Sequence, residues 1–372
     1  MKFGVFDHID QSGLAVGRQF EERLRLLEGY ERAGFYAYHL AEHHNTPLGH
    51  SPSPSVFVAA ATQRTTTLRL GPLVYCLPLY HPLRLIDEVC MLDHLSEGRL
   101  QLGVGAGVSP VEVGFLGVDW ETRRERFEEC FDILLNGLSS EELTHHGRYY
   151  DFDAVPMNLA PVQRPHPPLW FGISRPERAA WAAQHEVNSV ALLPPAMVRP
   201  ITDRYREEWE ALGRSPDELP LMGVSRLIVV AETADKAMAT ARRAYRLWFE
   251  NINLLWRKYD VPSPLDGVLP EDFVDWHDAR GGFAGTPAQA CEYIASEADE
   301  AGINYFCADL AFGDITYDEA LRTVGLFERE IAAARTAAAG DVTPLVSRRQ
   351  DLRRRRDAAI TRAMDETHAA SE

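Results

Sequence analysis

Residues 68–105 read LRLGPLVYCLPLYHPLRLIDEVCMLDHLSEGRLQLGVG and contain two apolar runs on either side of a longer mixed segment. The first run, residues 68–78, predicts a buried strand, and the last, residues 99–105, predicts a second one. Between them, residues 82–95 predict a helix. Strand, helix and strand in this order predict two parallel strands joined by a crossover helix.

The same alternation extends along most of the chain. Further helices are predicted over residues 18–33, 55–65 and 123–135. Further strands are predicted over residues 2–6, 35–40, 168–173, 187–192, 221–230 and 303–310. Eight strands with crossover helices favour a (β/α)8 TIM barrel over an open α/β sheet.

The domain organisation follows from where this rhythm holds and where it breaks. We expect one barrel domain over residues 1–335, interrupted by insertions at about 139–168 and 260–285. The first insertion is expected to form a hairpin and a loop, and the second has turn residues without a clear period. Residues 336–372 are rich in Ala and Arg and predict an appended C-terminal helical tail.

Composition and charge indicate which partners to exclude and in which cellular compartment to expect the protein. The formal charge of −17 repels phosphate backbones, so we expect no nucleic-acid partner. The chain has neither an apolar run long enough to span a membrane nor an N-terminal signal region, so we expect a cytoplasmic protein. Five cysteines without a C-x-x-C pair indicate reduced thiols and no disulfide framework.

Titratable and glycine-rich motifs follow the predicted strands. In an α/β barrel the active site lies at the carboxyl ends of the strands. Three sequence motifs and one group of residues at the end of the first strand follow predicted strands, and all are expected at the same end of the barrel. They are His8 with Asp7 and Asp10, the triplet Glu42-His43-His44, LGVGAGVSP at residues 102–110, and ISRPERAA at residues 173–180.

The triplet Glu42-His43-His44 allows two interpretations. Adjacent histidines in an extended loop point in opposite directions, and the H-E-x-x-H spacing of a zinc helix is absent, so we expect no metal. One histidine facing the mouth of the barrel would suit general acid–base chemistry. A histidine that only bonds a loop carbonyl explains the triplet equally well. The triplet alone leaves both interpretations open.

The other two motifs suggest a ligand that carries a phosphate. Residues 102–110 lack the spacing of a dinucleotide fingerprint, but their glycines allow either a tight turn or close approach of a ligand. Ser174 and Glu177 have the spacing of a capping box at the start of a helix. Arg175 and Arg178 would add charge to a phosphate site there, although a capped surface helix is the alternative.

Taken together, these segments resemble the bacterial luciferase-like flavin monooxygenases over residues 1–335. The segments are KFGVF, LAEHH, the stretch from GPLVYC to LQLGVGAG, FLGVD, WFGIS and GTPAQ. The resemblance implies a barrel that binds FMN, supplied reduced by a separate flavin reductase. It also implies a flavin hydroperoxide, formed with O2, that oxygenates a small to medium organic substrate. A homodimer is implied as well.

The resemblance also assigns expected roles to residues. The family's catalytic histidine corresponds to His43, with His44 beside it. The family's non-proline cis peptide, which presses against the flavin ring, corresponds to Leu73-Val74. The turn that binds the phosphate corresponds to Ser174, Arg175 and Arg178.

Two positions depart from the luciferase pattern. Gly105 stands where luciferase has a cysteine, and Ala106 stands where it has a phosphate-binding arginine. We expect Arg175 and Arg178 to supply that charge, and we expect extra room beside Gly105 in the cofactor site. Some relatives with glycine in this loop use a deazaflavin coenzyme, so a deazaflavin-dependent oxidoreductase is the alternative. A non-catalytic partner subunit is a second alternative.

Overall fold

The structure is a computed structural model that describes residues 1–338, with side chains described through Glu328. Residues Met1–Glu328 form one compact unit. In the remainder, only the continuation of the last helix to Ala338 is described. The arginine-rich part of the tail expected over residues 336–372 lies outside the described residues, so that expectation stays a prediction.

Within the described residues, ten strands form one sheet in the order β3-β2-β1-β12-β10-β9-β8-β5-β4, with β11 beside β10. Their bounds are β1 (Lys2–Asp7), β2 (Ala37–Leu40), β3 (Arg69–Pro72), β4 (Tyr75–Cys76), β5 (Leu102–Gly105), β8 (Leu169–Gly172), β9 (Asn188–Ala191), β10 (Met222–Val230), β11 (Gly282–Gly285) and β12 (Tyr305–Asp309). Every paired strand in this sheet is parallel to its neighbour.

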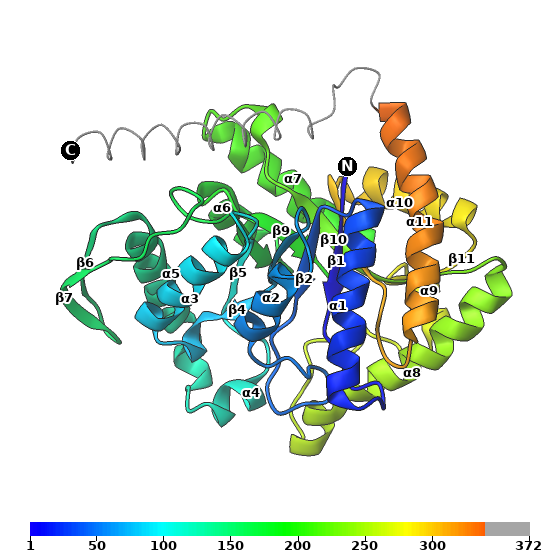
Figure 1. Ribbon diagram of the computed structural model, residues 1–372, viewed down its shortest axis with the longest axis horizontal. Coiled ribbons are helices and arrows are strands. Elements are labelled where there is room, and N and C mark those ends of the chain that lie inside the picture. Colours follow the sequence, from blue (N-terminus) through cyan, green and yellow to red (C-terminus); the bar gives the residue numbers. More distant parts are fainter. Residues whose placement is uncertain (339–372) are drawn as a thin grey trace, which may run out of the picture. The chain divides into compact units, whose positions relative to one another are not determined.

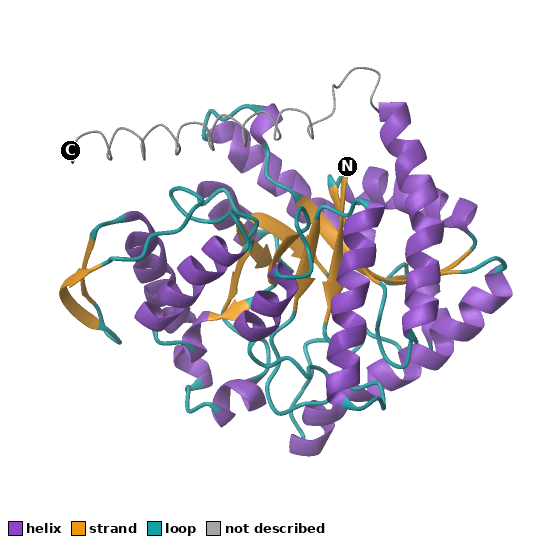
Figure 2. Ribbon diagram, in the orientation of Figure 1, coloured by secondary structure: helices purple, strands orange, loops and turns teal. Residues whose placement is uncertain are grey.

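The sheet closes on itself between β3 and β5. Leu70 of β3 forms a parallel bridge with Leu100, and its amide donates to the Arg99 carbonyl at 3.1 Å. β3 pairs with β2, and β4, which follows it directly in the chain, pairs with β5. Together β3 and β4 act as one interrupted strand. Eight strand positions therefore make the barrel, with β11 as an addition, and the predicted TIM barrel is confirmed. Figure 2 shows the strands enclosed by helices.

The helices surround this sheet (Figure 1). They are α1 (Val16–Ala33), α2 (Pro54–Thr62), α3 (Pro82–Leu95), α4 (Pro110–Phe115), α5 (Arg123–Ser139), α6 (Glu177–Gln184), α7 (Pro195–Ala211), α8 (Ala234–Tyr259), α9 (Phe273–Asp278), α10 (Pro287–Ala301) and α11 (Tyr317–Ala338), with 3-10 turns η1 (Leu77–Leu79), η2 (Trp120–Thr122) and η3 (Pro216–Glu218). Local chemistry sets several ends. Pro82 begins α3, where its missing N–H costs nothing, and Gly34 ends α1 in the left-handed region at φ 79°.

The two insertions turned out differently from each other. The first contains an antiparallel hairpin of β6 (Glu142–His146) and β7 (Asp151–Pro156), as expected. Glu129 of α5 holds its turn by accepting backbone N–H groups of Tyr149 and Tyr150. The second insertion is more regular than expected, because it contains α9 and β11. The strand escaped prediction because GFAG offers neither β-branched residues nor alternation.

The interior of the barrel is filled by aromatic and polar side chains. His39 Nε2 lies 2.8 Å from Tyr305 Oη, and the His39 ring packs on Trp170 at 4.4 Å between centroids. Trp170 donates its indole N–H to Gln101 at 2.7 Å. A Cβ at Gly4 would lie 1.6 Å from Tyr305 Oη, so only glycine leaves room for that ring. The barrel is thus a packed core whose free space lies at its ends.

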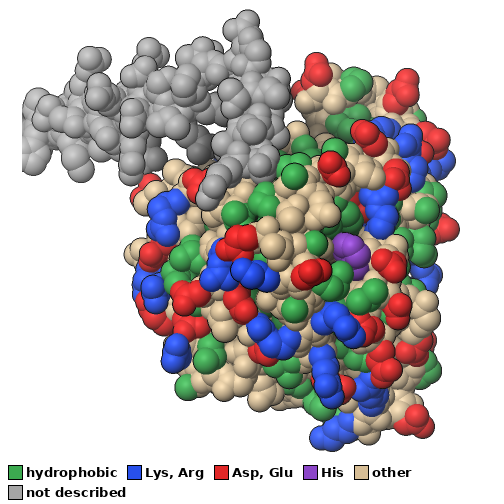
Figure 3. All heavy atoms as spheres, turned by 90° about the vertical axis from the view of Figure 1, so that its right-hand side faces the viewer, with side chains coloured by type: hydrophobic (Ala, Val, Ile, Leu, Met, Phe, Trp, Pro, Cys, Tyr) green, Lys and Arg blue, Asp and Glu red, His purple; other side chains and the backbone are tan. Residues whose placement is uncertain are grey.

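Acidic and basic side chains alternate on the face that carries α8, α9 and α11 (Figure 3). Arg242 of α8 pairs with Asp272, and Arg243 pairs with Asp314 and Glu319. Such exposed pairs are typical of a solvated surface and contribute little each to stability. Among the described residues, no helix is long and apolar enough to cross a membrane.

Candidate functional site at the carboxyl ends of the strands

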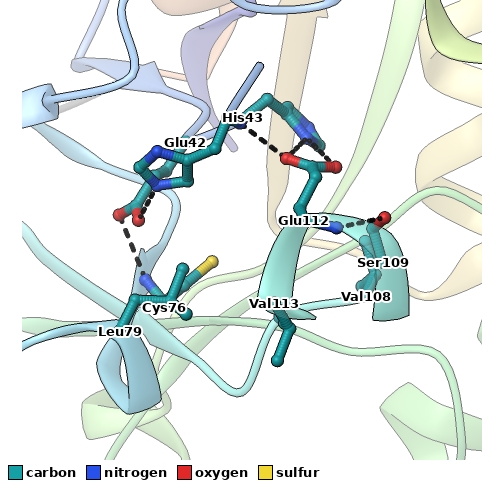
Figure 4. A pocket seen from close by; sticks show the side chains of 10 residues that line it. Glu42, His43, Cys76, Leu79, Val108, Ser109, Glu112 and Val113 are labelled. Atoms are coloured by element: carbon teal, nitrogen blue, oxygen red, sulfur yellow. Dashed lines mark hydrogen bonds and ion pairs between the residues drawn. The ribbon is translucent and has the colours of Figure 1, made fainter. Parts of the chain in front are cut away.

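A small pocket lies where the loop after β2, the turn η1 and the start of α4 meet (Figure 4). Glu42, His43 and His44 line it together with Cys76 and Glu112. All these segments follow the carboxyl ends of parallel strands, which is where a barrel places its active site. The triplet therefore lies at the end of the barrel expected from the sequence.

His43 is held by Glu112, the third residue of α4. Its Nδ1 lies 3.3 Å from both Glu112 carboxylate oxygens, and the backbone N–H of His44 donates to the same carboxylate at 2.6 Å. Ser109 fixes the start of this helix, because its hydroxyl accepts the Glu112 amide at 3.3 Å. His43 Nε2 makes no hydrogen bond within residues 1–328, so this nitrogen is free for a ligand.

Glu112 is a functional candidate that sequence reasoning missed. A signal existed, since Ser109 and Glu112 have the spacing of a capping box at the start of α4. Burial disfavours ionisation of Glu112, but the charge and hydrogen bond of His43, with the His44 amide, hold its pKa below the usual value. The carboxylate is therefore ionised at neutral pH and favours a proton on His43 Nδ1.

His44 contacts a different carboxylate from His43. Its Nε2 lies 2.8 Å from Glu42, and the other Glu42 oxygen accepts the Cys76 amide at 3.2 Å and the Tyr80 hydroxyl at 2.9 Å. Burial disfavours protonation of His44, but the Glu42 hydrogen bond and the nearby carboxylates outweigh it and raise its pKa. Glu42 thereby ties the loop after β2 to the segment after β4.

The contact between His44 and Glu42 makes the free energy of unfolding depend on pH. A pKa raised in the folded state adds stability below the unfolded pKa of about 6.5 and loses it as the pH rises through the folded pKa. We therefore expect the native protein to have a higher free energy of unfolding than His44→Gln, and we expect this difference to be largest at low pH. Urea unfolding of both proteins between about pH 6 and pH 9 measures that difference. A difference that does not decline with pH would contradict the assignment.

The peptide bond between Leu73 and Val74 is cis, at the interruption between β3 and β4. Leu73 belongs to the buried interior cluster, and Val74 is half-buried on top of it. A Cβ at Gly105 would lie 2.5 Å from Val74 Cγ2. The expectation of extra room beside Gly105 is therefore wrong. The side chain of Val74 fills the space that a side chain at position 105 would take.

The expected phosphate turn lies between β8 and α6. Ser174 and Arg175 are exposed, and Arg175 has no ion-pair partner within residues 1–328. Arg178 lies one turn further on and pairs with Glu128 at 3.2 Å. The predicted capping box is wrong: α6 begins at Glu177 without a side-chain cap, because Pro176 takes the N-cap position. The first amides of α6 are therefore left without a side-chain acceptor.

The turn after β8 adjoins the loop that carries Ala106, because β8 pairs with β5 in the sheet. Ala106 itself offers only a methyl group, so the cation available at this edge is Arg175. Among the described residues, no group of three His, Cys, Asp or Glu side chains has the arrangement of a metal site. All five cysteines lie within residues 1–328, and none of them forms a disulfide there.

A closed parallel barrel with titratable side chains gathered at the carboxyl ends of its strands defines a (β/α)8 protein with an enzyme-type site. Residues 1–305 match the model of the luciferase-like monooxygenases, and the chain belongs to that family. It is 40% identical over 331 residues to the uncharacterised protein y4wF of Sinorhizobium fredii, covering 89% of this chain and 96% of that one.

Relatives with assigned activities are more distant. Limonene 1,2-monooxygenase of Rhodococcus erythropolis is 28% identical over 287 residues, covering 75% of this chain and 72% of the enzyme. The solved structure of the monooxygenase RslO1 from Streptomyces bottropensis has a TM-score of 0.80 and 26% identity, covering 90% of this chain and all of that one. The family is thus one of oxidoreductases.

Two solved structures of lower identity share the fold. The oxygenating constituent of 3,6-diketocamphane monooxygenase from Pseudomonas putida, in complex with FMN, has a TM-score of 0.76 and 19% identity, covering 90% of this chain and 98% of that one. An F420-dependent secondary alcohol dehydrogenase has a TM-score of 0.68 and 19% identity, covering 89% and 98%. The fold therefore accommodates flavin in one neighbour and a deazaflavin in another.

Proposed function

We propose that this protein is the oxygenase component of a two-component monooxygenase that uses reduced FMN and O2. A separate flavin reductase would supply the reduced FMN, and the oxygenase would work as a cytoplasmic homodimer. The observation that carries the proposal is His43, held by Glu112 with a free Nε2 at the mouth of a luciferase-like barrel. Family membership indicates an oxidoreductase of the monooxygenase type, and the proposal adds FMN as the cofactor and His43 as the acid–base residue.

The described residues fit a bound FMN. Phe6 and Val74 are partly exposed apolar side chains on the interior cluster, so they would support a flat ring. Arg175 would hold the phosphate through its charge and Ser174 through its hydroxyl, beside the start of α6, where the helix dipole favours an anion. We propose Leu73, Gly105 and Ala106 as further contacts, because they end the strands that flank Val74.

When bound and reduced, the flavin would supply the electrons that activate O2 for transfer of one oxygen atom to the substrate. The chain's own residues would manage protons and water. Glu112 would accept the Nδ1 proton of His43, so Nε2 can accept a proton at the mouth and return it. Glu42 fixes His44 and the loop after β2, so His44 would act by shaping this site.

Apolar side chains around the pocket support an apolar substrate, and the family resemblance implies one of small to medium size. Leu79, Val108 and Val113 line it beside the titratable residues. Phe115 and Leu116, at the end of α4, are exposed. Limonene 1,2-monooxygenase, one of the relatives, is named for an apolar substrate, which supports the same substrate class.

Anaerobic protein with reduced FMN, mixed rapidly with oxygenated buffer, tests the proposal. We expect the absorbance of oxidised FMN to return more slowly than in protein-free buffer. We also expect a reductase-coupled assay with an apolar substrate such as limonene to incorporate oxygen from 18O2. Reoxidation as fast as in buffer, with no labelled product, would contradict the proposal.

Two alternative functions are distinguished by the affinity of the protein for reduced FMN and for a reduced deazaflavin. A deazaflavin-dependent oxidoreductase is favoured by Gly105, which luciferase-type sequences replace by cysteine. Such a protein would bind a reduced deazaflavin clearly more tightly than reduced FMN and would not consume O2. A non-catalytic partner subunit would bind neither coenzyme tightly.

A further inference from the structure

His8 lies directly after β1 and is 8% exposed. Its ring stacks on His43, with centroids 5.7 Å apart and planes at 29°. Phe6 and Trp248 contact the same ring edge to face, at 4.8 and 6.2 Å. His8 is therefore a buried imidazole fixed between aromatic rings, with one face against the histidine of the candidate site.

The edge of His8 faces Asp309, the last residue of β12. His8 Nδ1 lies 3.5 Å from Asp309 Oδ2, and neither atom has a hydrogen bond elsewhere in residues 1–328. β12 pairs with β1, so this contact is built into neighbouring strands of the barrel. An unpaired polar atom costs free energy when buried, which favours an interaction between these two groups.

Burial disfavours the charged forms of both groups in this contact. Burial, aided by the nearby charge of Asp7, raises the pKa of Asp309 well above its usual value. Burial, aided by His43, lowers the pKa of His8 to about 3. Asp7, at the end of β1, forms an ion pair with Arg23 at 3.0 Å. Burial thus favours the protonated form of Asp309, and that form can share its proton with His8 Nδ1.

Gly49 closes a third side of His43. A Cβ at this position would lie 3.1 Å from His43 Cβ and 3.6 Å from the His8 carbonyl oxygen. His43 is therefore confined at its edge by Glu112, on its face by His8 and behind its Cβ by Gly49.

We infer that His8 is a positioning residue for His43, with Asp309 holding the outer edge of the His8 ring. The inference rests on the proposed function, in which His43 Nε2 acts at the mouth of the barrel. Stacking fixes the plane of the His43 ring while Glu112 fixes its Nδ1, so Nε2 keeps one direction. A neutral His8 also places no second positive charge beside His43 when His43 takes up a proton.

Kinetics of His8→Ala and His8→Phe test this inference. We expect His8→Ala to lower kcat by about tenfold, since misplaced catalytic groups lose rate, with FMN affinity and KM changed less than about twofold. His8→Phe keeps a flat ring against His43 and should recover most of the loss. His185→Ala is the matched control, because His185 also packs against an aromatic ring, that of Trp181, at the end of α6.

Nitrogen NMR of histidine-labelled protein gives a reading that needs no cofactor. We expect a protonated Nδ1 of His43 in the native protein, assigned by its loss in His43→Gln. That signal should broaden by exchange with water in His8→Ala and persist in His8→Phe. An unchanged signal in His8→Ala overturns the inference, and so does a His8→Phe enzyme as slow as His8→Ala.

Gly49→Ala keeps the inference testable if His8→Ala does not fold. Its added methyl group would lie 3.1 Å from His43 Cβ, so His43 must shift by a few tenths of an ångström. A loss of kcat and of the Nδ1 signal in the same direction is therefore expected, and their retention would contradict the confinement of His43. Native protein without any turnover would end the proposed function and leave the NMR comparison valid. The two failures are therefore distinguishable.

Discussion

Replacing His43 by glutamine is expected to lower substrate turnover by about 10²- to 10⁴-fold, the usual contribution of a positioned general acid–base. FMN affinity should stay within about twofold, because Val74, Phe6 and Arg175 are untouched. Glutamine keeps hydrogen-bonding capacity toward Glu112 but cannot exchange protons near neutral pH. Reductase-coupled product formation, measured beside the FMN dissociation constant, separates the two effects.

The matched control is His146→Gln, on the exposed hairpin. His146 contacts Asp151 and is exposed, so the same chemical change there should leave turnover unaltered. Equal turnover of His43→Gln and native protein would remove His43 from the proposed role. A matching loss of FMN binding would instead assign His43 to the cofactor site alone.

The barrel was predictable because its signals are local. Each strand is a short apolar run followed by a helix with its own start and stop signals, as in residues 68–105. The same local pattern placed His43 and Arg175 at strand ends. The glycine-rich β11 carries no such signal, and only its pairing with β10 defines it.

The partners within the site could not be predicted in the same way. The contact between His43 and Glu112 spans 69 positions, and the contact between His8 and Asp309 spans the whole barrel. Both depend on which strands become neighbours on closure. The sequence showed two adjacent histidines and a carboxylate, but it could not show that His44 binds Glu42 while His43 binds a residue of α4.

Replacing both Arg175 and Arg178 by alanine is expected to weaken FMN binding by about 10²-fold, and Arg175→Ala alone should account for most of it. A hydrogen bond to a charged group contributes about 1.5–3 kcal/mol, or roughly 10- to 150-fold in Kd. Arg175 has no ion-pair partner within residues 1–328, whereas Arg178 is shared with Glu128. Arg178 would have to loosen that pair to reach a phosphate.

Riboflavin is the decisive control ligand, because it has the same ring as FMN and lacks the phosphate. Arg175→Ala should change the Kd for FMN, measured by fluorescence titration, and leave the Kd for riboflavin within about twofold. Arg199→Ala provides the control variant, since Arg199 lies on α7 and pairs with Asp203. Glu128→Gln should tighten FMN binding by releasing Arg178. If the double variant bound FMN as tightly as native protein, the phosphate would have to lie elsewhere.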